Sequence, residues 1–250
     1  MRYLLLLLMS VFVFSFNSYA YTLFWFTGAG IKNPAQKIAA IYNKTHKNKV
    51  AVIAGGSGQV LNEMIEAKKG DIYTLVDSIF LKKALKHKVV LQYKKLLKLT
   101  PVFVLSESGK QKIKNFYDLA NKGITIAGGN TKAMCLGKTF EEIMSKIPEH
   151  LSRRMNKNIT IRCLNVFQII GYAKEDSVDA GIVLDRALIK KTGLKYVNIP
   201  KKYNVNRYGY LTLVAYSKYK KAAEELFEFV WQHRNIYKQY GFNLASGGKR

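Results

Sequence analysis

An apolar, β-branched run that ends in a glycine-rich turn and continues as an amphipathic helix is the feature that most constrains this chain. Residues 50–54 (VAVIA) are typical of a buried strand, and the turn 55–58 (GGSG) follows directly. Apolar residues then recur at helical spacing over 60–65, and Gly70 ends the pattern. This order places unpaired backbone N–H groups and the Ser57 hydroxyl at the positive end of a helix dipole. The stretch therefore predicts an anion-binding site.

A structural role for the same motif is the alternative. The motif lacks the Lys-Ser/Thr pair of the phosphate loops of nucleotide hydrolases, and it lacks the spaced glycines of dinucleotide-binding turns. A tight strand-to-helix turn in which Ser57 caps the helix would use the same residues. The motif alone is compatible with both interpretations.

The first 20 residues have the layout of a secretory signal. Arg2 precedes an apolar segment over 4–16, and the small residues Ser18 and Ala20 follow it. We expect cleavage after Ala20 and a periplasmic mature chain that begins at Tyr21. The apolar segment is short for a membrane span, although an uncleaved anchor is the alternative.

The chain is strongly basic, with a formal net charge of +25. Its lysines occur in doublets spread along the whole sequence, without a basic tail or a known nucleic-acid-binding module. We therefore interpret the charge as a solvated cationic surface and expect no nucleic-acid partner. Attraction of anions towards a cleft is a further consequence of such a charge.

A second strand, glycine turn and helix come before the first. Residues 21–26 (YTLFWF) predict a strand, Thr27-Gly28-Ala29-Gly30 the turn, and Pro34 marks the first helical turn. In open α/β sheets, ligands bind beyond the carboxyl ends of the parallel strands. Thr27 and Ser57 are therefore expected to donate their hydroxyls to one ligand.

The rest of the chain alternates strands and helices, which predicts an α/β fold with two lobes. Each lobe is expected to hold a mostly parallel sheet flanked by helices. The division we expect is lobe I, residues 21–100 with 206–250, and lobe II, residues 101–205, joined by two hinge strands. The remaining predicted segments are strands at 71–76, 89–91, 100–105, 124–127, 159–163, 180–184 and 208–217, helices at 77–85, 116–119, 133–147, 166–172 and 221–237, and a polar loop at 106–114.

Several short motifs, in this order, resemble a known family. They are residues 28–30 (GAG), 54–60 (AGGSGQV), 69–73 (KGDIY), 128–130 (GGN) through Gly137, 165–166 (NV), 178–183 (VDAGIV) and 240–242 (YGF). The chain resembles the periplasmic molybdate/tungstate-binding proteins of ABC importers, which have the two-lobed type 2 periplasmic binding protein fold. The resemblance implies a monomer that delivers an oxyanion to a permease in the inner membrane, without a cofactor.

The resemblance also implies a set of ligand-binding residues. In that family, hydroxyls and backbone N–H groups of both lobes hold the oxyanion without formal positive charge, and closure brings them together. The residues implied here are Thr27, Gly28, Ala29, Ser57 and Gly58 from the first lobe and Met134, Cys135, Leu136 and Val166 from the second.

Two departures from the family leave the ligand open. Family members commonly have a serine where this chain has Gly28-Ala29-Gly30, and a tyrosine where it has Leu184-Asp185. Asp185 is a further candidate ligand residue, because its carboxylate could accept hydrogen bonds from a protonated or cationic ligand. Phosphate, sulfate or another oxyanion stays an alternative to molybdate and tungstate.

The two cysteines allow two interpretations. In an oxidising periplasm, Cys135 and Cys163 could form one disulfide in the second lobe. A free thiol at Cys135, in a proposed ligand loop, is the competing interpretation. The four histidines are scattered in polar contexts, so we expect no metal site built from cysteine and histidine.

Two other functions compete with oxyanion capture. Tyr203, Tyr208 and Tyr210 resemble the tyrosine clusters by which some related solute-binding proteins hold ferric iron. A cationic periplasmic sensor or adhesin would not depend on a small ligand, and the glycine turns argue against it. The chain lacks a nucleophile elbow and a His-Glu-x-x-His motif, so we expect that it is not an enzyme.

Overall fold

The computed structural model describes residues 20–131 and 134–246. Residues 1–19, on which the signal-peptide prediction rests, lie outside the described residues. The fold is α/β with two sheets and flanking helices, as predicted. In chain order the elements are β1 (Thr22–Gly28), η1 (Ala29–Ile31), α1 (Lys32–Thr45), β2 (Lys49–Gly55), α2 (Ser57–Ala67), β3 (Ile72–Val76), α3 (Ser78–Lys86), β4 (Val90–Leu99), β5 (Val102–Leu105), α4 (Glu107–Lys112), η2 (Phe116–Ala120), β6 (Ile126–Gly129), α5 (Cys135–Met144), α6 (Glu149–Lys157), β7 (Ile159–Cys163), α7 (Val166–Lys174), β8 (Ala180–Val183), η3 (Arg186–Ile189), β9 (Lys195–Asn198), β10 (Arg207–Val214), α8 (Lys220–Gln232), α9 (Ile236–Gln239) and β11 (Asn243–Leu244).

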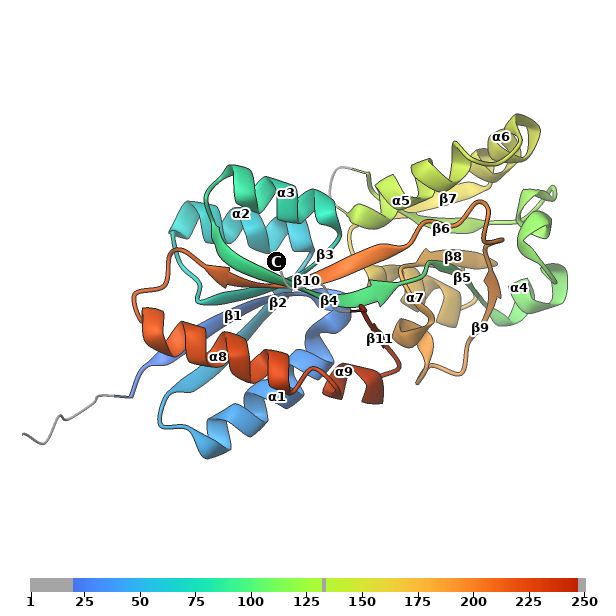
Figure 1. Cartoon of the computed structure of the whole chain (residues 1–250). Helices are drawn as coiled ribbons and strands as arrows, with labels where there is room; N and C mark the ends of the chain where they lie inside the picture. Colours follow the sequence, from blue (N-terminus) through green and yellow to red (C-terminus); the bar gives the residue numbers. More distant parts are fainter. Residues whose placement is uncertain (1–19, 132–133, 247–250) are drawn as a thin grey trace, which may run out of the picture.

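A six-stranded sheet with the order β11-β4-β10-β3-β1-β2 forms the core of one lobe. Its strands come from residues 22–99 and 207–244, and we use the name lobe I for this part. Strands β1, β2 and β3 are parallel, whereas β10 runs antiparallel to β3 and β4. Helices α2 and α3 cover one face, and α1, α8 and α9 cover the other (Figure 1). Because both faces are covered, β3 is buried along its whole length.

A five-stranded sheet with the order β7-β6-β8-β5-β9 forms the core of lobe II, the part of the chain between the two lobe I segments. Strands β6, β7 and β8 are parallel, and β5 is antiparallel to β8 and β9. The parallel strands end beside the N-termini of α5 and α7, which follow β6 and β7. This arrangement directs both helix N-termini towards lobe I.

Two crossing segments join the lobes, one between β4 and β5 and one between β9 and β10. Hydrogen bonds tie them together: the Thr100 hydroxyl donates to the Asn206 side chain at 3.1 Å, and the Asn204 side chain donates to the Pro101 carbonyl at 2.9 Å. Asp185 accepts the Thr100 N–H at 3.0 Å. The paired crossings are suited to act as a hinge.

Several elements differ from the sequence-based expectation, and helix α6 and strand β9 correspond to no predicted segment. Strand β4 continues to Leu99, whereas the sequence predicts an extended segment only at 89–91. The lysines make the segment look exposed, but Lys94 lies over the Phe227 and Trp231 rings, since a lysine stem can cover apolar surface. The polar segment 106–114 contains helix α4, whose N-cap Ser106 accepts the Gly109 N–H. The C-terminal helix ends at Gln232 and a short α9 follows.

A buried carboxylate holds lobe II together. Asp179, whose side chain is 4% exposed, accepts the Lys112 ammonium at 2.7 Å and both the N–H and the hydroxyl of Thr125 at 2.8 and 2.9 Å. Burial raises the pKa of this carboxyl, but the hydrogen bonds from Lys112 and Thr125 outweigh it, so the pKa lies below its ordinary value.

We expect Asp179→Asn to lower the free energy of unfolding by about 2 kcal/mol, the scale of hydrogen bonds to a charged group. Because the folded pKa is lowered, the stability from Asp179 is complete above the unfolded pKa of about 4 and is lost as the pH falls through the folded pKa. Thermal denaturation from pH 3 to pH 7 should therefore show a weaker pH dependence for Asp179→Asn than for the wild type. Glu149→Gln, at an exposed side chain, is the control, and parallel pH profiles for the Asp179 variant and the wild type would contradict the prediction.

Candidate functional site

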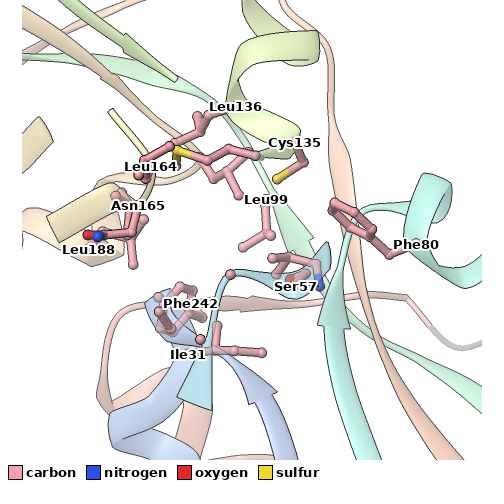
Figure 2. A pocket seen from close by; sticks show the side chains of 18 residues that line it. Ile31, Ser57, Phe80, Leu99, Cys135, Leu136, Leu164, Asn165, Leu188 and Phe242 are labelled. Atoms are coloured by element: carbon pink, nitrogen blue, oxygen red, sulfur yellow. Dashed lines mark hydrogen bonds between the residues drawn. The ribbon is translucent and has the colours of Figure 1, made fainter. Parts of the chain in front are cut away.

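A cavity of about 60 Å³ lies between the two lobes (Figure 2). Pockets for drug-sized ligands occupy several hundred Å³, so this space suits a smaller group. Ser57 and Phe80 of lobe I face Cys135 and Leu136 of lobe II across it (Figure 2). The lining residues are Ala29, Gly30, Ile31, Gly55, Gly56, Ser57, Val76, Phe80, Leu99 and Phe242 from lobe I and Met134, Cys135, Leu136, Leu164, Asn165, Val166, Leu184 and Leu188 from lobe II.

The N-terminus of α2 opens directly onto this cavity. Its first hydrogen bond runs from the Val60 N–H to the Gly56 carbonyl at 3.0 Å, so the N–H groups of Ser57 and Gly58 precede the helical ladder. The buried Tyr73 hydroxyl donates to the Ser57 carbonyl at 2.7 Å, which fixes the orientation of the first turn. The positive end of the α2 dipole is thus held against the cavity.

The Ser57 hydroxyl does not cap its helix. The N-cap residue is Gly56, without a side-chain cap, and Ser57 is the first helical residue. The Ser57 hydroxyl accepts the Val76 N–H at the long distance of 3.5 Å, which leaves its proton free to donate. A Cβ atom at Gly28 would lie 3.1 Å from this hydroxyl, so glycine at that position leaves room for it. The helix-capping role considered for Ser57 is therefore absent.

In lobe II, the N-termini of α5 and α7 also line the cavity. Asn165 caps α7: its side-chain oxygen accepts hydrogen bonds from the N–H groups of Phe167 and Gln168 at 3.0 and 3.1 Å. The cap does not use the Val166 N–H, which is therefore available to a ligand. Helix α5 begins at Cys135, after the Met134 N–H has donated to the Asn130 carbonyl at 2.9 Å. Three helix N-termini from two lobes therefore surround one space.

Both cysteines are free and buried. The structure therefore agrees with the free-thiol interpretation and has no disulfide between Cys135 and Cys163. Burial, together with the nearby Asp77 carboxylate, raises the pKa of the Cys135 thiol to about 12. The thiol that lines the cavity is therefore neutral at physiological pH and does not repel an anion.

The structure brings together six of the residues expected from the sequence: Ala29, Ser57, Met134, Cys135, Leu136 and Val166 line the cavity. Gly28 and Gly58 lie directly behind the wall. A Cβ atom at Gly58 would lie 2.9 Å from the Phe80 ring, which is part of that wall. These two glycines therefore make space for the lining side chains.

Thr27 and Asp185 are not among the residues that line the cavity. The buried Thr27 hydroxyl accepts from Thr74, which in turn accepts the Trp25 indole N–H, so Thr27 belongs to the interior of lobe I. Asp185 caps η3 through the Ala187 N–H at 2.9 Å and also holds the hinge residue Thr100. Burial raises the pKa of Asp185, and these hydrogen bonds oppose that effect. The hydrogen bonds that these two side chains make in the structure are to other protein groups, and a ligand role for them stays a prediction.

The apolar walls of the cavity were not expected from the sequence. They come from segments that are distant in sequence, such as Ile31, Phe80, Leu188 and Phe242. Their apolar character gives no signal, because it is equally typical of the core. Asn165 had a usable signal, since an Asn between a strand and a helix is a typical N-cap.

The tyrosines proposed for iron do not meet at the cavity. Tyr203 packs near the Phe116 ring in lobe II, whereas Tyr208 and Tyr210 pack in lobe I with Lys95 and Tyr93. Within residues 20–131 and 134–246 no group of three or more His, Cys, Asp or Glu side chains could hold a metal ion. The same residues include no helix that is long and apolar enough to cross a membrane.

Comparison with protein families gives a match over nearly the whole described chain. The model for bacterial extracellular solute-binding proteins matches residues 23–243. The chain belongs to this family. The matched residues include every described residue that lines the cavity, from Ala29 to Phe242.

Three known proteins are similar to this solute-binding protein over most of its chain. A protein of Haemophilus influenzae described as a putative binding protein is 29% identical over 221 residues, which cover 88% of this chain and 89% of the relative. The periplasmic molybdate-binding protein of Azotobacter vinelandii has a TM-score of 0.75 at 17% identity, with 90% and 100% of the two chains covered. PEB3 of Campylobacter jejuni with bound L-phospholactate has a TM-score of 0.73 at 19% identity, with 88% and 99% covered. At these identities the likeness of the two structures to this chain shows the fold and nothing about the ligand.

Thiol titration tests the state of the cysteines. The protein is purified from an oxidising compartment and then unfolded in guanidinium without reductant. We expect two reactive thiols per chain. In the native protein at pH 8, Cys135 should react at least about 100-fold more slowly than a free cysteine, because the thiolate is the reactive form and its pKa is raised. Recovery of thiols only after reduction would show a disulfide and contradict the structure.

Proposed function

We propose that this solute-binding protein captures a tetrahedral oxyanion, molybdate or tungstate, between its lobes and delivers it to an ABC importer. The observation that carries the proposal is the convergence of the N-termini of α2, α5 and α7 on one small cavity. Each N-terminus offers backbone N–H groups and the positive end of a dipole to an anion. None of the described residues that line the cavity is Lys or Arg.

Neutral donors are sufficient for such a ligand. A dianion removed from water needs a full set of hydrogen bonds, and N–H and O–H groups that bond to a charged oxygen form strong ones. The Ser57 and Gly58 amides lie in lobe I, whereas those of Cys135, Leu136 and Val166 lie in lobe II. An oxyanion bonded to both groups therefore stabilises the closed arrangement of the lobes.

The proposal includes a place and a partner. The predicted signal peptide directs the mature chain to the periplasm, and a permease in the inner membrane receives the ligand from a monomer. Neither a cofactor nor a nucleic acid is needed for this role. The cationic surface draws anions towards the chain by long-range attraction.

A phosphorylated small organic acid is a second candidate ligand. Apolar side chains adjoin the proposed amide cluster, among them Met134, Leu188 and Leu164, which is 59% exposed. Such side chains would contact the carbon skeleton of an organic phosphate and have no partner in bare molybdate. L-Phospholactate, the ligand in the PEB3 structure, is a compound of this class.

A thermal-shift screen of residues 21–250 separates the candidates. The panel contains molybdate, tungstate, sulfate, phosphate, L-phospholactate and ferric citrate. A ligand at about 100 times its Kd adds about 2.7 kcal/mol to the free energy of unfolding, which raises Tm by roughly 5 to 10 °C. We expect this shift with molybdate and tungstate. A shift with L-phospholactate alone would favour the second candidate, and a shift with none of the compounds would contradict oxyanion capture.

The variant Ser57→Ala tests the anion-binding role of the hydroxyl. We expect the affinity for molybdate, measured by calorimetry, to fall by about 10- to 100-fold, the equivalent of one hydrogen bond to a charged group. The Tm without ligand should change little, because the hydroxyl does not cap α2. Ser152→Ala, in helix α6 of lobe II, is the control. A wild-type affinity in Ser57→Ala would show that the hydroxyl does not contact the ligand.

A further inference from the structure

One guanidinium contacts both lobes at the edge of the hinge. Arg207 is the first residue of β10 in lobe I, and its side chain is 12% exposed. Its Nε lies 3.3 Å from Asp77 Oδ2 in lobe I and donates to the Thr139 hydroxyl of lobe II at 2.9 Å. Its Nη2 donates to Glu142 Oε2, also of lobe II, at 2.6 Å. We call this group of four residues the Arg207 bridge.

The bridge differs from the other ion pairs of the described residues, each of which lies within one lobe. Those pairs are His46–Glu225 and Lys94–Glu228 in lobe I, and Lys110–Glu107, Lys112–Asp179, Lys146–Glu142 and Arg153–Glu149 in lobe II. A hinge motion leaves such pairs intact. It would change the distance between Arg207 and Glu142.

Asp77 fixes the guanidinium on the lobe I side. Its carboxylate is fully buried, with one oxygen accepting the Ile79 N–H at 3.0 Å and the other, Oδ2, facing Arg207. Oδ2 has no hydrogen bond within the described residues, so the nearby positive charge is its compensation. Asp77 also has a φ of 93°, a costly backbone conformation for a residue other than glycine. The surrounding structure therefore holds this carboxylate firmly in place.

Both ends of the bridge adjoin the cavity. Asp77 follows Val76, which lines the wall on the lobe I side. On the lobe II side, the Thr139 hydroxyl accepts from Arg207 and donates to the Cys135 carbonyl at 2.8 Å. Cys135 begins α5 and lines the cavity. The bridge thus joins the two walls of the proposed site without contacting the cavity.

We propose that Arg207 is the closure residue of this protein: it carries a preformed contact with Asp77 and makes its bonds to Thr139 and Glu142 only when the lobes close. Opening the hinge breaks two charge-assisted hydrogen bonds in addition to those of the ligand. The residue therefore sets how long a captured ligand is held and positions the α5 N-terminus. The effect on ligand release rests on the proposed function, whereas the effect on the balance between open and closed lobes does not.

Stopped-flow release of molybdate tests the bridge. Removing Arg207 would leave Asp77 buried and uncompensated and could unfold the protein, so the primary variants are Glu142→Gln and Thr139→Val, with Arg207→Lys as the conservative change. We expect Glu142→Gln and Thr139→Val to release molybdate about threefold to tenfold faster, with an association rate within about twofold of the wild type. Glu149→Gln, which removes the charge of an exposed pair within lobe II, should behave as the wild type.

A wild-type release rate in both primary variants would overturn the inference. If molybdate and the rest of the anion panel fail to bind, the proposed function fails and the bridge is tested in the protein alone by small-angle X-ray scattering. Glu142→Gln should then have a larger radius of gyration than the wild type and Glu149→Gln. Equal radii would overturn the inference in that case.

Discussion

A small anion that leaves water must regain its hydrogen bonds inside the protein, and in the proposed function this requirement explains the arrangement at the cavity. Backbone N–H groups at helix N-termini meet it without adding a charged side chain. Parallel strands followed by helices place these groups at the same end of a sheet. Lobe I contributes α2, lobe II contributes α5 and α7, and the sheets direct all three towards the same space.

The need to combine donors from two bodies also explains the hinge. Neither sheet alone surrounds the cavity, so a ligand is enclosed only when the crossing segments let the lobes meet. Asp185 and Asn204 tie these segments together, and Arg207 lies where the second one enters lobe I. In the proposed mechanism the charges near the cavity serve closure, whereas neutral groups line the cavity itself.

The features predicted from the sequence were those encoded in consecutive residues. The strand, glycine turn and helix around Ser57 and the alternation of strands and helices indicated the α/β fold and placed Ser57 at the site, whereas the other five lining residues were implied by the family resemblance. Thr27 and Asp185 stood at the correct strand ends, but which way a side chain points depends on strand register and on neighbours such as Thr74 and Thr100. Arg207 gave no signal, since its partners are 65 or more residues away in the chain.

A crystal structure of the protein soaked with tungstate, with anomalous differences measured at the tungsten edge, would locate the oxyanion site. We expect one strong peak between the lobes, within hydrogen-bonding distance of the Ser57 hydroxyl and of the backbone N–H groups at the starts of α2, α5 and α7. A peak elsewhere, or an unoccupied cavity at saturating tungstate, would contradict the claim that these helix N-termini form an oxyanion site.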